Sequence, residues 1–269
     1  MDSNENITPP EETTNENGEL SHSDKMIGVF TEPAKMFQQT SKFPPRNKDW
    51  VIPVLILFLV AALIRIIAMT NKEVYFEAKE KGVERIEKMV ESGTLTREQG
   101  DEAINGIDQQ MEFMQGPVGW VITIATSVIF GFIVFFIIVG IYYLFIRFML
   151  KGEGSFASAL VANGLTIYIN IIQIIIAGII TMIMGRMIMD TSVASLIGSD
   201  KNTLVGWVLA RLDPISIWAY IVLAIGFAKM FKSESTGKYY ALVFGVWLIG
   251  MFILFQVAQA IPFLQNFMQ

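Results

Sequence analysis

The stretch ANGLTIYINIIQIIIAGIIT, from Ala162 to Thr181, decides the fold because it has the composition of a helix that crosses a membrane. A crossing helix needs about 20 mostly apolar residues. This one also carries Asn163, Asn170 and Gln173, and amides are unfavourable in lipid unless they find hydrogen-bond partners. We therefore predict an integral membrane protein in which this helix turns its amides toward protein or a wet cavity.

Other long apolar runs surround this stretch. The chain has 269 residues, 53% of them hydrophobic, and this clustering excludes an ordinary soluble core. Together with the run from Phe156 to Met184, four more runs predict an all-α membrane protein, a bundle of five transmembrane helices. The four runs are Trp50 to Met69, Pro117 to Phe148, Pro214 to Phe231 and Tyr239 to Ile261.

The polar residues of the third span share one face. On a helical wheel, Asn163, Thr166, Asn170 and Gln173 fall within one arc of about 80°, with isoleucines around most of the remaining circumference. Such a stripe is typical of contacts between membrane helices. The alternative is the lining of a polar path, although amides do not titrate and make a poor proton relay. These four residues are the candidate functional stripe.

Three further polar residues mark the ends of predicted spans. Asp213 followed by Pro214 predicts an N-cap with proline at the first helical position of the fourth span, and Asp49 can cap the first span. Arg65 lies near the end of the first span, where its stem is long enough to snorkel to the interface. The alternative for Arg65, a buried ion pair, lacks a carboxylate at matching depth.

Several functions lack the residues that they require. The chain has no cysteine, and its single histidine, His22, is expected to be a solvated residue of the tail. No HExxH or GxSxG pattern and no pair of membrane aspartates is present. We predict no enzymatic activity, no cofactor and no metal. The net charge of −5 and the scattered basic residues predict no nucleic-acid partner, and no small-molecule substrate is identifiable.

The segments outside the spans are polar or amphipathic. Residues 1–25 are predicted to be a disordered acidic tail, and residues 263–269 a short C-terminal tail. Residues 26–49 carry an apolar stripe that predicts an amphipathic helix in the membrane interface, or one packed on the protein's own helix ends. Residues 71–115, with eleven carboxylates and six basic groups, predict an extramembrane helical hairpin inserted into the membrane domain of residues 50–262. A capping box, TREQ at Thr96 to Gln99, opens the second helix of this hairpin.

Orientation follows from the basic residues of short connections. Arg147 and Lys151 flank the second span, and Lys229, Lys232 and Lys238 lie between the last two spans. Because such residues stay in the cytoplasm, we predict a cytoplasmic N-terminus and an external C-terminus.

Four quoted segments carry a resemblance to a known family. They are MIGVFTEPAKMF, DWVIPVLIL, KGEGSFASALVANGL and LDPISIWAYIVLAIGFAKMFKSESTGKYYALVFGVWLI, in that order along the chain. From about Met26 to Pro262 the sequence resembles bacterial members of the Yip family, whose eukaryotic members are named for interaction with Rab-type GTPases. The resemblance implies five helices, a cytoplasmic N-terminus and a place in a bacterial inner membrane. For eukaryotic relatives it implies roles in vesicle trafficking and membrane shaping.

The function expected from these observations is that of a non-enzymatic polytopic protein that organises membrane or partner proteins. Its partners would be the lipid bilayer and membrane proteins, including further copies of itself, with the tail and the hairpin as contact surfaces. The alternative is a small transporter, channel or lipid-moving protein in which Asn163, Asn170 and Gln173 line the path.

Overall fold

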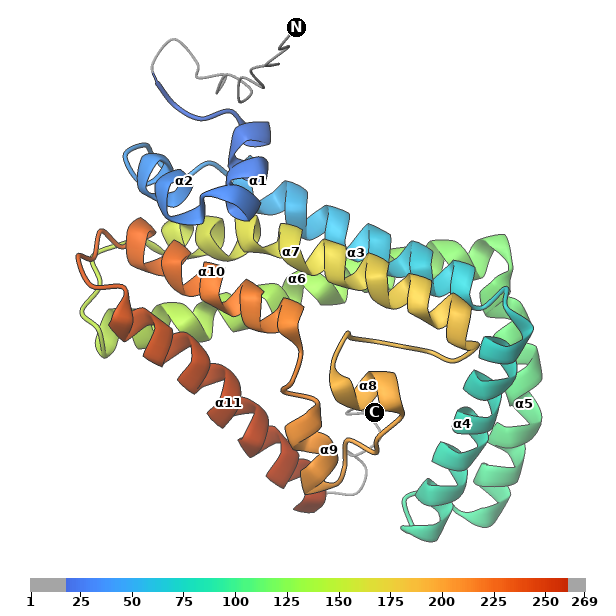
Figure 1. The fold of residues 1–269 in the computed structure, drawn as a ribbon. Coiled ribbons are helices and arrows are strands. Elements are labelled where there is room, and N and C mark those ends of the chain that lie inside the picture. The colour runs from blue at the N-terminus through green and yellow to red at the C-terminus, as the bar shows by residue number, and fades with distance from the viewer. Residues whose placement is uncertain (1–17, 261–269) are drawn as a thin grey trace, which may run out of the picture.

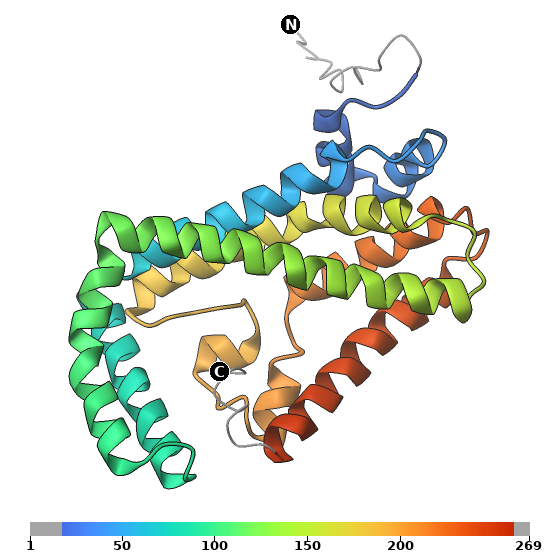
Figure 2. The ribbon, with the colours of Figure 1, turned by 180° about the vertical axis from the view of Figure 1, so that it is seen from behind.

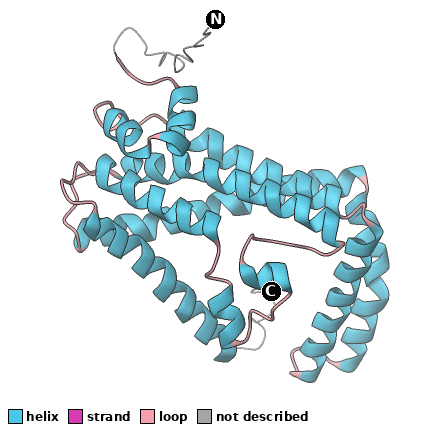
Figure 3. Ribbon diagram, viewed as in Figure 1, coloured by secondary structure: helices cyan, strands magenta, loops and turns pink. Residues whose placement is uncertain are grey.

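The computed structural model describes residues 18–260, and every element in that range is a helix (Figures 1 and 3). Four helices are long and apolar enough to cross a membrane: α3 (Lys48–Ala68), α6 (Pro117–Phe148), α7 (Phe156–Met184) and α11 (Gly237–Ala260). The fifth apolar helix, α10 (Pro214–Met230), has 17 residues. The all-helical class is confirmed, whereas a count of five crossings stays a prediction. The expectations for residues 1–17 and 261–269 fall outside the described residues.

The central helix of the bundle is α7. Of the 18 consecutive residues that form its apolar stretch, 44% are buried, whereas the same fraction is 17–22% in α3, α6 and α11. The helices α3 and α10 pack directly on α7, and α6 packs on α3 (Figures 1 and 2). The predicted polar stripe therefore belongs to the helix that has the most protein around it.

A glycine allows α3 and α7 to approach each other closely. A Cβ atom added to Gly164 of α7 would lie 2.4 Å from the Cα atom of Trp50 in α3. Backbone atoms cannot move aside as the end of a side chain can, so no residue other than glycine fits here without a shift of a helix. Small residues at such contacts are usual in membrane bundles.

The N-terminal helices α1 (His22–Thr31) and α2 (Pro33–Thr40) lie across one end of the bundle (Figure 1). Val29 and Phe37 are fully buried, and the ring of Phe37 lies against Gly226 of α10. The buried sides of these helices thus pack on the protein's own helices, the second of the two arrangements expected for this segment. The helix α1 begins inside the predicted tail, so the expectation of disorder is wrong for residues 18–25.

The acidic insertion forms the antiparallel helices α4 (Lys72–Glu91) and α5 (Arg97–Gln115), which project from the other end of the bundle (Figure 2). The capping box of Thr96 and Gln99 is formed, with both hydrogen bonds present. Two short helices not expected from the sequence, α8 (Val193–Ile197) and α9 (Leu204–Leu209), occupy the connection between α7 and α10. Neither is long enough to show a helical period.

The contact at Gly164 gives a first prediction. We expect Gly164→Ala to lower the free energy of unfolding by about 1–3 kcal/mol, because overpacking forces α3 away from α7. The measurement is the melting temperature in detergent. The control is Gly250→Ala in α11, whose added Cβ meets nothing within 4 Å. Equal melting temperatures for Gly164→Ala and the wild type would contradict the close packing of α3 on α7.

Candidate functional site in the helix bundle

Gln173 and Asp213 form a buried polar cluster beside the middle of α7. The Nε2 atom of Gln173 donates to Oδ2 of Asp213 at 2.7 Å and lies 2.8 Å from Oγ of Ser216. Thr191 donates its hydroxyl to Oδ1 of Asp213 at 2.8 Å. Gln173 and Asp213 are only 8% and 2% exposed. The amide predicted to face inward and the aspartate predicted to start a helix are therefore partners, 40 residues apart in sequence.

Asp213 also caps α10. Its Oδ1 atom accepts from the backbone amides of Ile215 and Ser216, and Pro214 occupies the start of the helix. The carboxylate thus receives hydrogen bonds from two side chains and two amides. With its acceptor positions used, it is poorly placed to act as a base, and the arrangement resembles a structural anchor more than a reactive centre.

The other residues of the predicted stripe are placed differently. Thr166 is buried and donates its hydroxyl to the carbonyl of Ala162 in its own helix, at 2.8 Å. Asn163 and Asn170 are half-buried, and among residues 18–260 their side chains make no hydrogen bond. The structure therefore brings Gln173 into a hydrogen-bond network with Asp213, and the other residues of the stripe are not part of that network.

A second cluster holds the N-terminal helices to the bundle. His22 contacts Oδ1 of Asp49 at 2.8 Å through Nδ1, and the hydroxyl of Tyr168 at 2.7 Å through Nε2. Lys25 donates to Oδ2 of Asp49 at 2.6 Å, and both side chains are almost completely buried. The expectation that His22 is a solvated tail residue is wrong, because α1 carries it to α3 and α7.

Two more charged groups complete this cluster. Glu19 accepts from Lys25 at 3.3 Å and forms an ion pair with Arg46. Asp49 was expected to cap α3 but is the second residue of the helix and is an ion-pair partner instead, and Asn47 occupies the N-cap position. Removing one partner of a buried pair is strongly destabilising, so these contacts fix α1 on the bundle.

Sequence reasoning missed this second cluster because its members come from distant segments. The one local signal is the capping box of Ser21 and Asp24, which starts a helix inside the predicted tail. That pattern gives no indication that Asp49 and Tyr168 are the partners of the polar side chains of α1.

A third group of charges orders the connection between α7 and α10. Asp190 accepts from Lys201 at 2.7 Å and from the hydroxyls of Ser192 and Ser195. Burial alone would raise the pKa of Asp190, but these hydrogen bonds and the charge of Lys201 outweigh it and lower the pKa to about 2. The carboxylate is consequently charged at neutral pH and holds the connection in a folded form.

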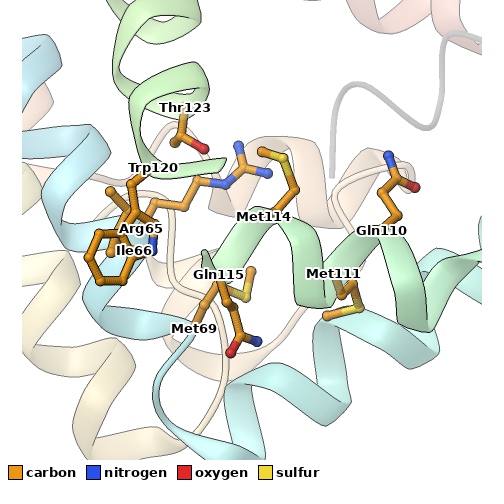
Figure 4. A pocket seen from close by; sticks show the side chains of 9 residues that line it. All are labelled: Arg65, Ile66, Met69, Gln110, Met111, Met114, Gln115, Trp120 and Thr123. Carbon is orange, nitrogen blue, oxygen red and sulfur yellow. The ribbon is translucent and has the colours of Figure 1, made fainter. Parts of the chain in front are cut away.

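Arg65 lies in the last turn of α3, with its side chain largely exposed. It lines a pocket of about 240 Å³ between the ends of α3 and α5 and the start of α6 (Figure 4). Among the residues that the structure describes, its guanidinium makes no ion pair or hydrogen bond. Within those same residues, no group of three or more histidines and carboxylates is placed to hold a metal ion.

Long apolar helices around buried polar contacts define a polytopic helical membrane protein. The family model of the Yip1 domain matches residues 27–257, most of the chain. The chain belongs to this family, which is not a known enzyme family. No curated protein and no solved structure shows a significant match to the chain.

The Gln173 cluster gives a second prediction. We expect Gln173→Leu to lower the free energy of unfolding by about 1–3 kcal/mol, because the buried Asp213 carboxylate loses a donor. The melting temperature in detergent measures the effect. Asn170→Leu, on the same helix but outside the network, is the matched control and is expected to change it little.

The same two variants separate a structural role from a path. In liposomes, the permeability to K⁺ and to a small fluorescent solute should be equal for the wild type and both variants. A changed permeability in Asn170→Leu, with an unchanged melting temperature, would favour a polar path along α7 instead.

Proposed function

We propose that this chain is a non-enzymatic membrane protein that organises partner proteins at the bilayer through the hairpin of α4 and α5. The single observation that carries the proposal is an acidic stripe on the outer side of α4. Glu80, Glu84, Glu87 and Glu91 recur at intervals of three and four residues, and all four are exposed. That spacing places them on one face of the helix.

The stripe has the features of a contact surface for a basic partner. Phe76 continues it by one turn toward the bundle and is 63% exposed, which is unusual for an aromatic ring outside a membrane span. Of the four glutamates, Glu84 pairs with Lys88, and Glu80, Glu87 and Glu91 make no ion pair within residues 18–260. An exposed aromatic ring is typical of sites that bind proteins, and a row of carboxylates beside it would steer a basic partner toward it.

The base of the hairpin supports this role by fixing the hairpin to the membrane domain. Glu77 accepts from the backbone amide of Met187 at 2.7 Å, which joins α4 to the connection after α7. Lys79 and Asp108 form an ion pair at 2.5 Å between the two helices of the hairpin. The stripe is therefore presented in a defined direction.

We further propose that α10 completes a fifth crossing. At 1.5 Å per residue its 17 residues rise about 26 Å, somewhat less than the hydrocarbon thickness of about 30 Å. The segment just before Asp213 would supply the remainder, and the contacts of Asp213 with Gln173 and Thr191 support this. Irregular backbone is tolerated at membrane depth where protein surrounds it.

In this proposal the N-terminus is cytoplasmic, the C-terminus is external, and the membrane is a bacterial inner membrane. The helix α2 and the connections between α6 and α7 and between α10 and α11 lie at one end of the bundle (Figure 1). These segments carry the basic residues Lys35, Lys151 and Lys232. The hairpin lies at the other end and is acidic overall. Because short cytoplasmic segments are enriched in lysine and arginine, this distribution favours a cytoplasmic location for the end of the bundle that holds the N-terminal helices.

A transporter, channel or lipid-moving protein is the second candidate function. The observation that favours it is the lack of a hydrogen bond to the half-buried side chains of Asn163 and Asn170 within residues 18–260. Against it stands Gln173, whose amide nitrogen is engaged by Asp213 and Ser216. Contact between copies of this chain is also part of the proposal, and it is compatible with either function.

The topology gives a third prediction. The chain has no cysteine, so single cysteines at Thr94, Asp200 and Ser235 are unique labels. A membrane-impermeant maleimide added to right-side-out vesicles should label the variants Thr94→Cys and Asp200→Cys but not Ser235→Cys, and inside-out vesicles should show the reverse. Labelling of Asp200→Cys and Ser235→Cys from one side would mean that α10 does not cross.

The acidic stripe gives a fourth prediction. With a photo-crosslinking amino acid at Phe76, native membranes should yield discrete crosslinked proteins. The triple variant Glu80→Gln, Glu87→Gln, Glu91→Gln is expected to reduce these crosslinks at least tenfold, because a desolvated charge pair at an interface contributes strongly to binding. The matched control neutralises Glu98, Glu102 and Glu112, three exposed carboxylates of α5. Equal losses from both variants would argue against a specific surface on α4.

A further inference from the structure

The pocket at the base of the hairpin has a composition unlike the surface around it. Its walls come from the last turns of α3 and α5 and the first two turns of α6 (Figure 4). The lining side chains are Arg65, Ile66, Met69, Gln110, Met111, Met114, Gln115, Trp120 and Thr123. The pocket thus combines one cation and a few hydrogen-bonding groups with a soft apolar wall of three methionines, which adapts to varied shapes.

The charge of this pocket is positive although the hairpin that helps to form it is acidic. None of the eleven carboxylates of residues 71–115 lines the pocket, and Arg65 is its one charged lining group. In Figure 4 the guanidinium of Arg65 extends between Thr123 and Met114. Within residues 18–260 it has no ion-pair partner, and a guanidinium favours bidentate contact with carboxylate or phosphate oxygens.

The depth of the pocket identifies the source of such an anion. Arg65 is in the last turn of α3 and Trp120 in the first turn of α6, so the pocket lies at the level where two apolar spans end. Tryptophan is enriched at this level, beside the lipid headgroups. Deeper along the two spans, Leu63 of α3 and Ile129 of α6 are 50% and 63% exposed and present apolar surface suited to acyl chains.

We propose that this pocket binds the phosphate of an anionic phospholipid in the leaflet on the hairpin side. Arg65 contacts the phosphate, Thr123 and the two glutamines are in reach of the polar headgroup, and the acyl chains extend along the apolar surface of α3 and α6. The site does not overlap the partner surface proposed on α4, because no residue of the acidic stripe lines it.

The test compares lipids on the full-length protein purified in detergent. Phosphatidylglycerol should raise the melting temperature of the wild type by several degrees, and native mass spectrometry should show the bound lipid. Phosphatidylcholine should do neither, because its choline offsets the phosphate charge. Equal stabilisation by both lipids would overturn the proposal.

Substitutions inside and outside the pocket test whether the lipid binds there. Arg65→Gln should weaken the affinity for phosphatidylglycerol about tenfold, which corresponds to about 1.4 kcal/mol, because the phosphate loses its charge-assisted hydrogen bonds. Arg85→Gln, which removes the same charge from an exposed position of α4, should bind as the wild type does. Met114→Trp fills the pocket without changing its charge and should reduce binding as Arg65→Gln does. Retention of the lipid by both pocket variants would overturn the proposal.

Inorganic phosphate separates the two sources of the anion. Without lipid, phosphate at millimolar concentration should leave the melting temperature unchanged, because the apolar wall contributes nothing to a free ion. Saturable stabilisation by phosphate that Arg65→Gln abolishes would show a site for the free anion and would contradict the assignment to a lipid.

Discussion

The buried carboxylate of Asp213 is the group on which the arrangement of the C-terminal half depends. Inside a bundle of apolar helices, an ionised group without hydrogen bonds is strongly unfavourable. Asp213 obtains its donors from Gln173 of α7, from Thr191 of the connection and from the first turn of α10. Satisfying one charge therefore fixes three segments relative to one another, and it sets the point beside α7 at which α10 begins.

The same requirement operates nearer the N-terminal end of α7. There the hydroxyl of Tyr168 contacts His22, and His22 and Lys25 together surround the carboxylate of Asp49. Two polar residues of α7, Tyr168 and Gln173, thus serve two unrelated attachments, one for the N-terminal helices and one for α10. The two attachments account for Tyr168 and Gln173, whereas Asn163 and Asn170 take part in neither. The helix that carries them also has the largest buried fraction of the four long helices.

Local features of the sequence were sufficient to predict the long helices and several of their ends. The runs from Pro117 to Phe148 and from Phe156 to Met184 coincide with α6 and α7, because proline, glycine and serine mark their boundaries. The partners of Gln173 and His22 were not predictable, since Asp213 lies 40 residues from Gln173, Tyr168 lies 146 residues from His22, and no local pattern encodes such pairing. Wheel geometry grouped Gln173 with Asn170 on one face, but it gives no information on which neighbour reaches each side chain.

The junction of α5 and α6 connects the hairpin mechanically to the membrane domain. Gly116 alone separates the two helices, and a Cβ atom at Gly119 would lie 2.4 Å from the carbonyl oxygen of Phe113. The first turn of α6 is therefore pressed against the last turn of α5, and the hairpin cannot pivot without moving α6. The pocket of Arg65 has walls from both sides of this junction, so a change in the hairpin's direction changes the shape of the pocket. On the two proposals above, a lipid in the pocket and a protein on α4 would both act on this junction, and by linkage each would change the affinity of the chain for the other.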